Sequence, residues 1–341
     1  MAMRRVVVYP GRIAVEAAEV PAPGPNAALV RTLAAGVCGS DLHAAHGRHP
    51  FVALPYRPGH EVVGVIEAAG SAAGSCAPGQ RVIVEPDLPC WTCKMCTTGR
   101  ENLCENLQFF GCGYAQGGMA DYFTLAANRL HPVPDSLDDH TAALIEPLST
   151  PVHAVRLAGD VASRSVAILG TGTIGLFTLA VLRAHGAGKI VSTDPNPAKR
   201  ERAAALGADV TIDARGPDVA GQVREELGGS ADIVFDCVAI QSSVDQAIAI
   251  ADKGGTVMVV GVPAREVTVP LPIVQDHQIR IQGSATYLPE DYAESASLLS
   301  RGAVRTADFV TATRPLAQVA EAFELASSGQ HVKVLVTVGE R

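Results

Sequence analysis

The sequence predicts an α/β protein of two domains, one rich in β-strands and one built on a doubly wound parallel sheet. The chain has 341 residues, enough for about two domains of ~150 residues each. Its first 150 residues are rich in Gly and Pro and carry short strand-like runs, whereas strands alternate with helices between residues 152 and 286. The residues after 286 are too few for a third core, so we expect them to pack on the first domain.

The first domain is expected to be all-β or barrel-like. Short apolar runs at 5–9, 62–67 and 81–85 are rich in Val and Ile, and Gly- and Pro-rich turns separate them. Many short strands joined by turns are typical of such a domain. The pattern changes near residue 150.

The second domain is predicted from its regular alternation. Residues 166–169 predict a buried strand, and a glycine turn leads from it into an apolar helix at 174–184. The next predicted elements are strand 190–194, helix 198–206, strand 209–212, helix 219–227, strand 232–236, helix 243–252 and strand 256–260. In the C-terminal segment we expect helices at 289–301 and 315–328 and a last strand at 332–338.

Composition and charge exclude several classes of protein. The chain is 48% hydrophobic and has no charge blocks, which excludes extended disorder. Its 27 Lys and Arg against 35 Asp and Glu give a net charge of −8, so nucleic acid is not an expected partner. Residues 165–182 carry no formal charge, but their glycine-rich turn predicts a strand and a helix rather than a membrane span. The N-terminal apolar run is too short for a signal peptide, so we expect a cytoplasmic protein.

Four of the eight cysteines predict a structural zinc site. Cys90, Cys93, Cys96 and Cys104 fall within fifteen residues and are expected to be reduced, because no export signal is evident. Four thiolates at this spacing can close a tetrahedral Zn²⁺ shell and leave no position for water. A zinc-ribbon module for nucleic acid is the alternative, and it is disfavoured because only Lys94 and Arg100 add positive charge to the loop.

A glycine-rich turn predicts a dinucleotide site. Gly170, Gly172 and Gly175 form a GxGxxG pattern between a predicted strand and a predicted helix, and Asp194 follows Gly175 by nineteen residues. The glycines permit a tight turn and close approach of pyrophosphate to a helix N-terminus. Asp194 would bind the ribose hydroxyls and repel a 2′-phosphate, which favours NAD over NADP, although Lys199 follows closely and leaves NADP open. Thr173 and Ile174 complete the candidate loop.

A dispersed set of residues suggests a catalytic zinc. Cys, His and Glu are zinc donors, and three protein ligands with an open fourth position are typical of catalytic sites. The candidates lie in three segments, namely Cys38, Ser40 and His43, then His60 and Glu61, then Glu146. Taken singly, His60 is more often a structural histidine and Glu61 a surface charge.

The ordered motifs resemble the zinc-dependent medium-chain dehydrogenase/reductase family over essentially the whole chain. They are Cys-Gly-Ser-Asp-x-His at 38–43, Pro-Gly-His-Glu at 58–61, the four-cysteine loop, Glu-Pro-Leu-Ser at 146–149 and the glycine turn. The Glu-Pro-Leu-Ser motif is similar to the polyol branch, which includes sorbitol and butanediol dehydrogenases. This resemblance implies a GroES-like catalytic domain at 1–151 and 287–341, a Rossmann NAD-binding domain at 152–286, and a homo-oligomer, either a tetramer or a dimer.

The resemblance also implies roles for individual residues. Cys38 and His60 would bind the catalytic zinc, and Glu61 and Glu146 would complete its shell, one as a ligand and the other through a bound water, in either assignment. Ser40 would take the alcohol proton, and His43 would relay it to solvent. The expected reaction is hydride transfer from a zinc-bound alkoxide of a secondary alcohol to NAD.

The substrate is predicted only as a class. Thr286 stands where sorbitol dehydrogenases carry an arginine beside Tyr287, which disfavours long polyols, so the predicted class is a polyol, diol or cyclitol. The alternatives are a threonine or amino-alcohol dehydrogenase, a zinc-free quinone or enone reductase of the same superfamily, and a non-catalytic zinc-binding scaffold.

Overall fold

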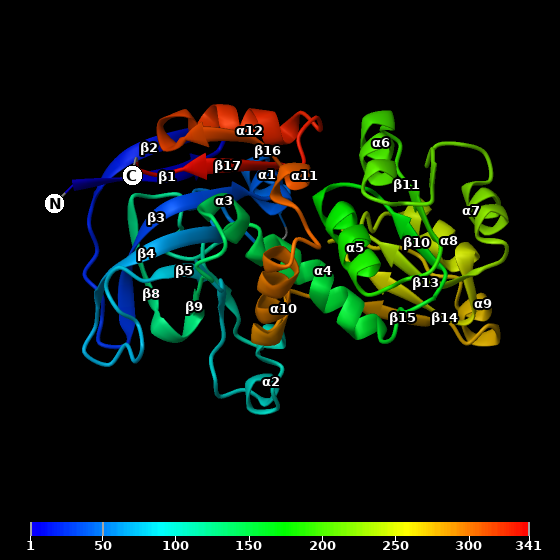
Figure 1. The fold of residues 1–341 in the computed structure, drawn as a ribbon, viewed down its shortest axis with the longest axis horizontal. Coiled ribbons are helices and arrows are strands. Elements are labelled where there is room, and N and C mark those ends of the chain that lie inside the picture. The colour runs from blue at the N-terminus through cyan, green and yellow to red at the C-terminus, as the bar shows by residue number, and fades with distance from the viewer. Residues whose placement is uncertain (1, 50, 340–341) are drawn as a thin grey trace. The chain divides into compact units, whose positions relative to one another are not determined.

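The computed structural model describes residues 2–49 and 51–339, which divide into two compact units (Figure 1). Unit 1 comprises Met1–Pro147 and Leu288–Arg341, and unit 2 comprises Leu148–Tyr287. The first boundary lies four residues before the one expected at 151/152, inside helix α4 (Ile145–Ala158). The second lies one residue after the one expected at 286/287.

A seven-stranded sheet forms the core of unit 1. Its order is β16-β17-β3-β4-β5-β9, and β8 also pairs with β3. Alternate side chains of β3 are buried, as expected for a strand with one face on a core. The strands are β3 (Ala27–Val37), β4 (Glu61–Ala69), β5 (Arg81–Val84), β8 (Tyr122–Ala126), β9 (Leu130–Pro132), β16 (Val310–Pro315) and β17 (Lys333–Thr337). Two two-stranded sheets complete the unit, β1 (Ala2–Tyr9) with β2 (Arg12–Glu19) and β6 (Asp87–Leu88) with β7 (Gln108–Phe109).

The helices of unit 1 are short and connect or cover these strands. The helix expected at 315–328 begins only at Val319, because Pro315 ends strand β16 and a 3₁₀ turn follows it. Val319, Ala322 and Phe323 bury one face of that helix against the sheet. The helices are α1 (Gly39–Ala45), α2 (Lys94–Thr97), α3 (Asp139–Ala142), α10 (Pro289–Ser300), α11 (Thr306–Phe309) and α12 (Val319–Ser327). The 3₁₀ turns are η1 (Glu101–Leu103), η2 (Ala127–Arg129) and η3 (Leu316–Gln318).

Unit 2 is built on a six-stranded parallel sheet with the order β12-β11-β10-β13-β14-β15. Numbered from the first strand of the unit, this order is 3-2-1-4-5-6, which is the Rossmann arrangement. The strands are β10 (Val166–Leu169), β11 (Ile190–Thr193), β12 (Val210–Ile212), β13 (Ala231–Asp236), β14 (Ala251–Val259) and β15 (Arg280–Gly283). The helices are α5 (Thr173–Ala184), α6 (Pro197–Ala205), α7 (Val219–Leu227), α8 (Gln241–Ile250) and α9 (Leu271–Asp276).

The uncharged stretch at 165–182 is divided between β10 and α5, as expected. All four residues of β10 are buried, which explains the apolar run without a membrane. Among residues 2–49 and 51–339, no helix is both long and apolar enough to cross a bilayer.

Candidate functional site

Cys38 is held at the start of helix α1 by a buried aspartate. Strand β3 ends at Val37, and Cys38 takes extended dihedrals as the N-cap of α1. Its backbone N–H donates to Asp41 Oδ2 at 3.0 Å, and the Tyr56 hydroxyl donates to Asp41 Oδ1 at 3.1 Å. Burial raises the pKa of Asp41 and the pKa of Tyr56. Sequence reasoning missed both residues, and the Asp of the Cys-Gly-Ser-Asp motif was the available signal for Asp41.

His60 and Glu61 reach the same place from the start of strand β4. Gly59 precedes them at φ +105°, and a Cβ there would lie 2.3 Å from the backbone nitrogen of Met119, so this turn requires glycine. Both side chains are buried. One ligand atom from each of Cys38, His60 and Glu61 lies within 4.8 Å of the other two. Three residues of the predicted dispersed set therefore converge in unit 1.

The charges around His60 favour a cation. Burial alone would lower the pKa of His60, but the negative charges of Asp41 and Cys38 outweigh it, and the pKa lies well above its usual value. The buried Nδ1 atom of His60 has no hydrogen-bond partner in the part of the chain that the structure describes. Thiolate, imidazole and carboxylate donors in a negatively charged pocket fit a zinc ion.

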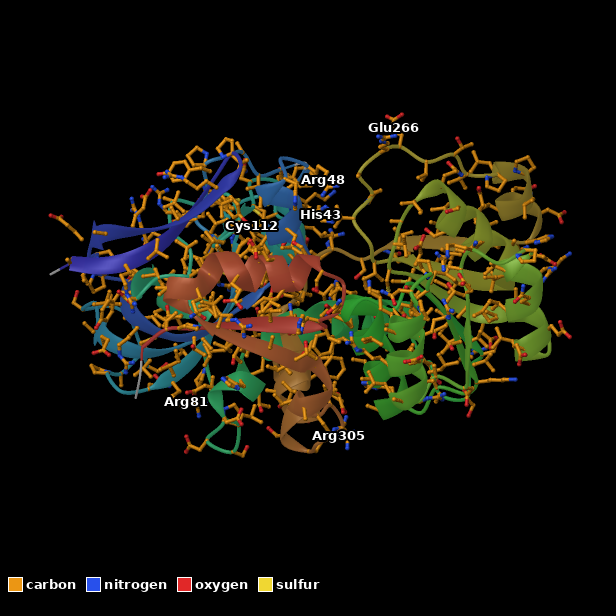
Figure 2. The ribbon with its side chains drawn as sticks, turned by 90° about the horizontal axis from the view of Figure 1, so that it is seen from above. His43, Arg48, Arg81, Cys112, Glu266 and Arg305 are labelled. Carbon is orange, nitrogen blue, oxygen red and sulfur yellow. The ribbon has the colours of Figure 1, made fainter. Side chains whose placement is uncertain are left out.

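Two other predicted residues, Glu146 and Ser40, lie near this group, and a third, His43, lies on the same helix as Ser40. Glu146 is buried in the first turn of α4, and its charge contributes to the raised pKa of His60. Ser40 Oγ lies 3.5 Å from His60 Nε2. His43 is exposed in the last turn of α1, where its carbonyl oxygen accepts the backbone N–H of Arg48 (Figure 2).

A buried lysine that sequence reasoning missed also enters this site. Lys333 Nζ lies 2.5 Å and 2.8 Å from the two carboxylate oxygens of Glu61. The available signal was a single Lys within the apolar C-terminal strand, because a lysine is rarely fully buried unless it is paired.

The four cysteines of the loop at 90–104 also converge, and their sulfurs all lie within 4.8 Å of one another. The Cys93–Cys96 and Cys93–Cys104 sulfur distances are 3.5 Å and 3.9 Å. A tetrahedral zinc with Zn–S bonds of about 2.3 Å separates its sulfurs by about 3.8 Å, whereas a disulfide needs about 2.05 Å. The hydrogen bond from the Thr92 backbone is the main cause that lowers the pKa of Cys90 to about 5. The geometry fits four thiolate ligands.

The glycine loop of unit 2 leaves space for a ligand. A Cβ on Gly175 would lie 1.9 Å from the Gly170 carbonyl oxygen, so the crossing of loop and helix requires glycine there. A Cβ on Gly172, the N-cap of α5, would meet nothing within 4 Å. Asp194 is buried at the carboxyl end of β11, and its Oδ2 accepts the Thr171 backbone N–H at 2.9 Å. This open helix N-terminus beside a carboxylate fits the pyrophosphate and ribose of a dinucleotide.

Comparison with known proteins identifies the family. Residues 24–135 match the alcohol dehydrogenase GroES-like domain, and residues 173–301 match the zinc-binding dehydrogenase model. The L-galactonate-5-dehydrogenase of Escherichia coli (strain K12) is 34% identical over 90% of this chain and 89% of its own length. The sorbitol dehydrogenase of Gallus gallus is 34% identical over 97% and 95%. The chain belongs to the zinc-binding dehydrogenase family.

A solved structure agrees with this membership. A zinc-binding dehydrogenase from Sinorhizobium meliloti 1021, bound to NADP, superposes with a TM-score of 0.92 at 32% identity and covers 99% of each chain. The chain is therefore a zinc- and nicotinamide-dependent oxidoreductase that acts on alcohols. The predicted family, fold class and enzyme class are confirmed, as are zinc and a nicotinamide dinucleotide as cofactors.

Lys199 and two further cysteines of this dehydrogenase lie on the elements around these groups. Lys199 is half-buried on α6, where the neighbouring Arg200 donates to the Asp194 carbonyl oxygen at 2.7 Å. Burial raises the pKa of Cys112, which lies among the charges of His60, Asp41 and Cys38, and the pKa of Cys237, which lies beside Gly170, to about 12. We expect both thiols to stay protonated at neutral pH.

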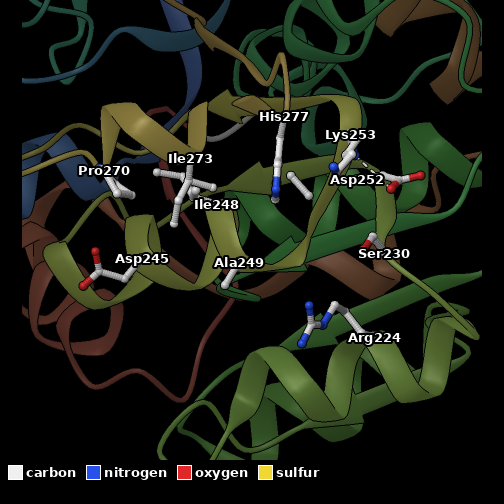
Figure 3. A pocket seen from close by; sticks show the side chains of 11 residues that line it. Arg224, Ser230, Asp245, Ile248, Ala249, Asp252, Lys253, Pro270, Ile273 and His277 are labelled. Atoms are coloured by element: carbon white, nitrogen blue, oxygen red, sulfur yellow. Dashed lines mark hydrogen bonds between the residues drawn. The ribbon is translucent and has the colours of Figure 1, made fainter. Parts of the chain in front are cut away.

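Unit 2 of the dehydrogenase also has a pocket of about 440 Å³ (Figure 3). Ser230, Ala251 and His277 place it at the amino ends of β13, β14 and β15. The glycine loop follows the carboxyl end of β10, so this pocket is separate from the cofactor loop.

Proposed function

We propose that this protein oxidises a secondary alcohol of the polyol, diol or cyclitol class to a ketone, with NAD as the hydride acceptor. The observation that carries the proposal is the convergence of the half-buried Cys38 with the buried His60 and Glu61, whose ligand atoms lie within 4.8 Å of one another. Unit 1 would be the catalytic domain, and unit 2, with its glycine loop, the NAD-binding domain. The reaction moves a hydride from the alcohol carbon to the nicotinamide and releases the hydroxyl proton.

Cys38 and His60 would hold the catalytic zinc, and Glu61 and Glu146 would complete the shell, one as a ligand and the other through a bound water. When bound, the zinc supplies a Lewis acid that lowers the pKa of a substrate hydroxyl, and NAD supplies the hydride acceptor. Asp41 keeps Cys38 in place by accepting a hydrogen bond from the backbone N–H of Cys38. The four-cysteine loop would hold a second, structural zinc, which is supported by its sulfur spacing.

Ser40 and His43 would carry the proton away. Ser40 Oγ, 3.5 Å from His60 Nε2, lies close enough to a ligand of the metal to accept the proton of a substrate hydroxyl. His43 is on the same short helix and is exposed, so it would pass the proton to solvent.

The cofactor preference would follow from Asp194. Its carboxylate is fixed beside the glycine loop by the N–H of Thr171. In this position it would accept hydrogen bonds from the ribose hydroxyls and repel a 2′-phosphate. Gly172, Thr173 and Ile174 would place the first N–H groups of α5 against the pyrophosphate.

The names of two relatives support the substrate class, because sorbitol and L-galactonate both have polyhydroxy chains. The deciding experiment measures NADH formation over a panel of diols, polyols, cyclitols, amino alcohols and threonine, with and without a zinc chelator. A chelator-sensitive rate confined to polyols or diols supports the proposal. A rate confined to threonine or amino alcohols, or one that ignores the chelator, contradicts it.

We also propose a cytoplasmic homo-oligomer, a tetramer or a dimer. All eight cysteines are free, which suits a reducing compartment. Edge strand β15 is largely exposed, and Ile281 on it is 40% exposed, so a second copy would cover an otherwise open sheet edge. Light scattering of the purified protein tests the assembly, and a monomer at micromolar concentration contradicts it.

A further inference from the structure

The ion pair between Lys333 and Glu61 is buried on both sides. The exposed fractions of the two side chains are 3% and 1%. Lys333 Nζ contacts both carboxylate oxygens and lies 3.4 Å from the carbonyl oxygen of Val37, the residue before Cys38. Burial of a lysine costs desolvation free energy, so the carboxylate of Glu61 must compensate the charge of Lys333.

Three neighbouring strands bring this pair together. β17 pairs with β3 through Val334 and Val37, and β3 pairs with β4 through Gly36 and Glu61. A Cβ on Gly36 would lie 1.8 Å from Glu61 Oε2. The middle strand therefore lacks a side chain at the point where the carboxylate lies beside it.

The ammonium and a metal would compete for the same carboxylate. Glu61 lies within reach of Cys38 and His60, yet both of its oxygens are hydrogen-bond acceptors for Lys333. The thiolate of Cys38 and the carboxylates of Asp41, Glu61 and Glu146 carry four negative charges against the two positive charges of a zinc ion. The charge of Lys333 reduces this excess in a buried site, and it draws Glu61 away from the metal.

We propose that Lys333 is a positioning residue that weakens the hold of Glu61 on the catalytic metal and so keeps one coordination position open to the substrate hydroxyl. This proposal rests on the proposed function, in which Cys38 and His60 hold zinc. Lys333 acts through Glu61 and does not touch the substrate. Without Lys333, Glu61 closes the shell.

The test uses the full chain with Co²⁺ in place of zinc, and imidazole as a probe of the open position. Titration of imidazole against the visible ligand-field bands gives its Kd without any turnover. We expect Lys333→Met to weaken imidazole binding and to raise the KM of the alcohol about 10- to 100-fold, the range for outer residues that tune a metal site. Lys333→Arg keeps the positive charge, so its imidazole Kd and its KM for the alcohol should stay close to those of the wild type. A wild-type imidazole Kd in Lys333→Met overturns the proposal.

A second variant covers the case in which Lys333→Met does not fold. The double variant Lys333→Met/Glu61→Gln has no unpaired buried charge, and without the competing carboxylate it should bind imidazole with a Kd near that of the wild type. A double variant that folds but binds imidazole as weakly as Lys333→Met contradicts the proposal. If only the double variant folds, the proposal is contradicted when its imidazole Kd is well above that of the wild type.

A matched control and the wild type separate the possible failures. Arg129→Met breaks another buried ion pair of unit 1, with Glu85, and should lower the melting temperature while leaving the imidazole Kd unchanged. If the wild type binds a single metal ion, held by the four-cysteine loop, the proposed function fails together with this inference. If the wild type binds two metal ions and oxidises an alcohol, and Lys333→Met has the imidazole Kd of the wild type, only the role proposed for Lys333 is contradicted.

Discussion

Replacing Arg129 with Met should destabilise unit 1 strongly, although Arg129 is not part of either metal site. Arg129 Nη1 lies 2.6 Å from Glu85 Oε1, and the two side chains are 5% and 1% exposed. Removal of one partner of a buried pair leaves an uncompensated charge and costs about 3–5 kcal/mol. His131 Nε2 lies 2.5 Å from the other Glu85 oxygen and stays in place, so we expect the lower end, about 3 kcal/mol. For a unit of this size, that corresponds to a fall of roughly 6–12 °C in melting temperature.

Calorimetry of the zinc-loaded protein measures this change, and the fluorescence of Trp91 reports it locally. Trp91 is the single tryptophan of the chain, lies in the four-cysteine loop, and stacks 4.9 Å from the Arg129 guanidinium. The control is Arg4→Met, which breaks an exposed pair with Asp121 and should cost less than about 1 kcal/mol. The reasoning is refuted if Arg129→Met lowers the melting temperature no more than Arg4→Met does.

The remaining predictions concern the two candidate sites. His60→Ala should abolish alcohol oxidation with little change in NADH binding measured by fluorescence. Chelator-sensitive turnover near the wild-type rate in this variant would show that His60 is not a zinc ligand. Gly175→Ala should weaken NADH binding about 5- to 150-fold, because its Cβ would lie 1.9 Å from the Gly170 carbonyl oxygen and the loop must shift at a cost of roughly 1–3 kcal/mol; an unchanged Kd contradicts this. Asp194→Ser should lower the kcat/KM ratio of NAD to NADP by about 10- to 150-fold, the loss of hydrogen bonds to a charged group; a ratio that stays constant assigns the preference elsewhere.

Local motifs allowed most of the site to be predicted. The cysteines of the loop lie within fifteen residues, and the glycine turn and Asp194 lie at the ends of adjacent strands, so a short spacing carries each pattern. Strand β10 was predicted at its observed bounds because all of its residues are buried. These features depend on neighbours in the chain.

The features that were missed depend on distant partners. Lys333 and Glu61 are 272 residues apart, and only the pairing of β17, β3 and β4 brings them together. The start of the helix near 315 was misplaced because the sequence does not show that Pro315 extends a strand paired with β17. Strand β15 has only four residues and is mostly exposed, so it lacks the apolar pattern of a parallel strand.

The route of the chain through unit 1 has a consequence for synthesis on the ribosome. Strand β17 pairs with β3, so the sheet that carries Cys38 and Glu61 gains its last strands only after all of unit 2 has been made. Unit 2 is continuous in sequence and can fold as it emerges, whereas unit 1 must wait for its final residues. Until then the Glu61 carboxylate has no ammonium beside it. A nascent chain cut before residue 333 would carry a complete nucleotide fold and an unfinished metal centre, so the release of the chain also sets the earliest moment at which the enzyme can become active.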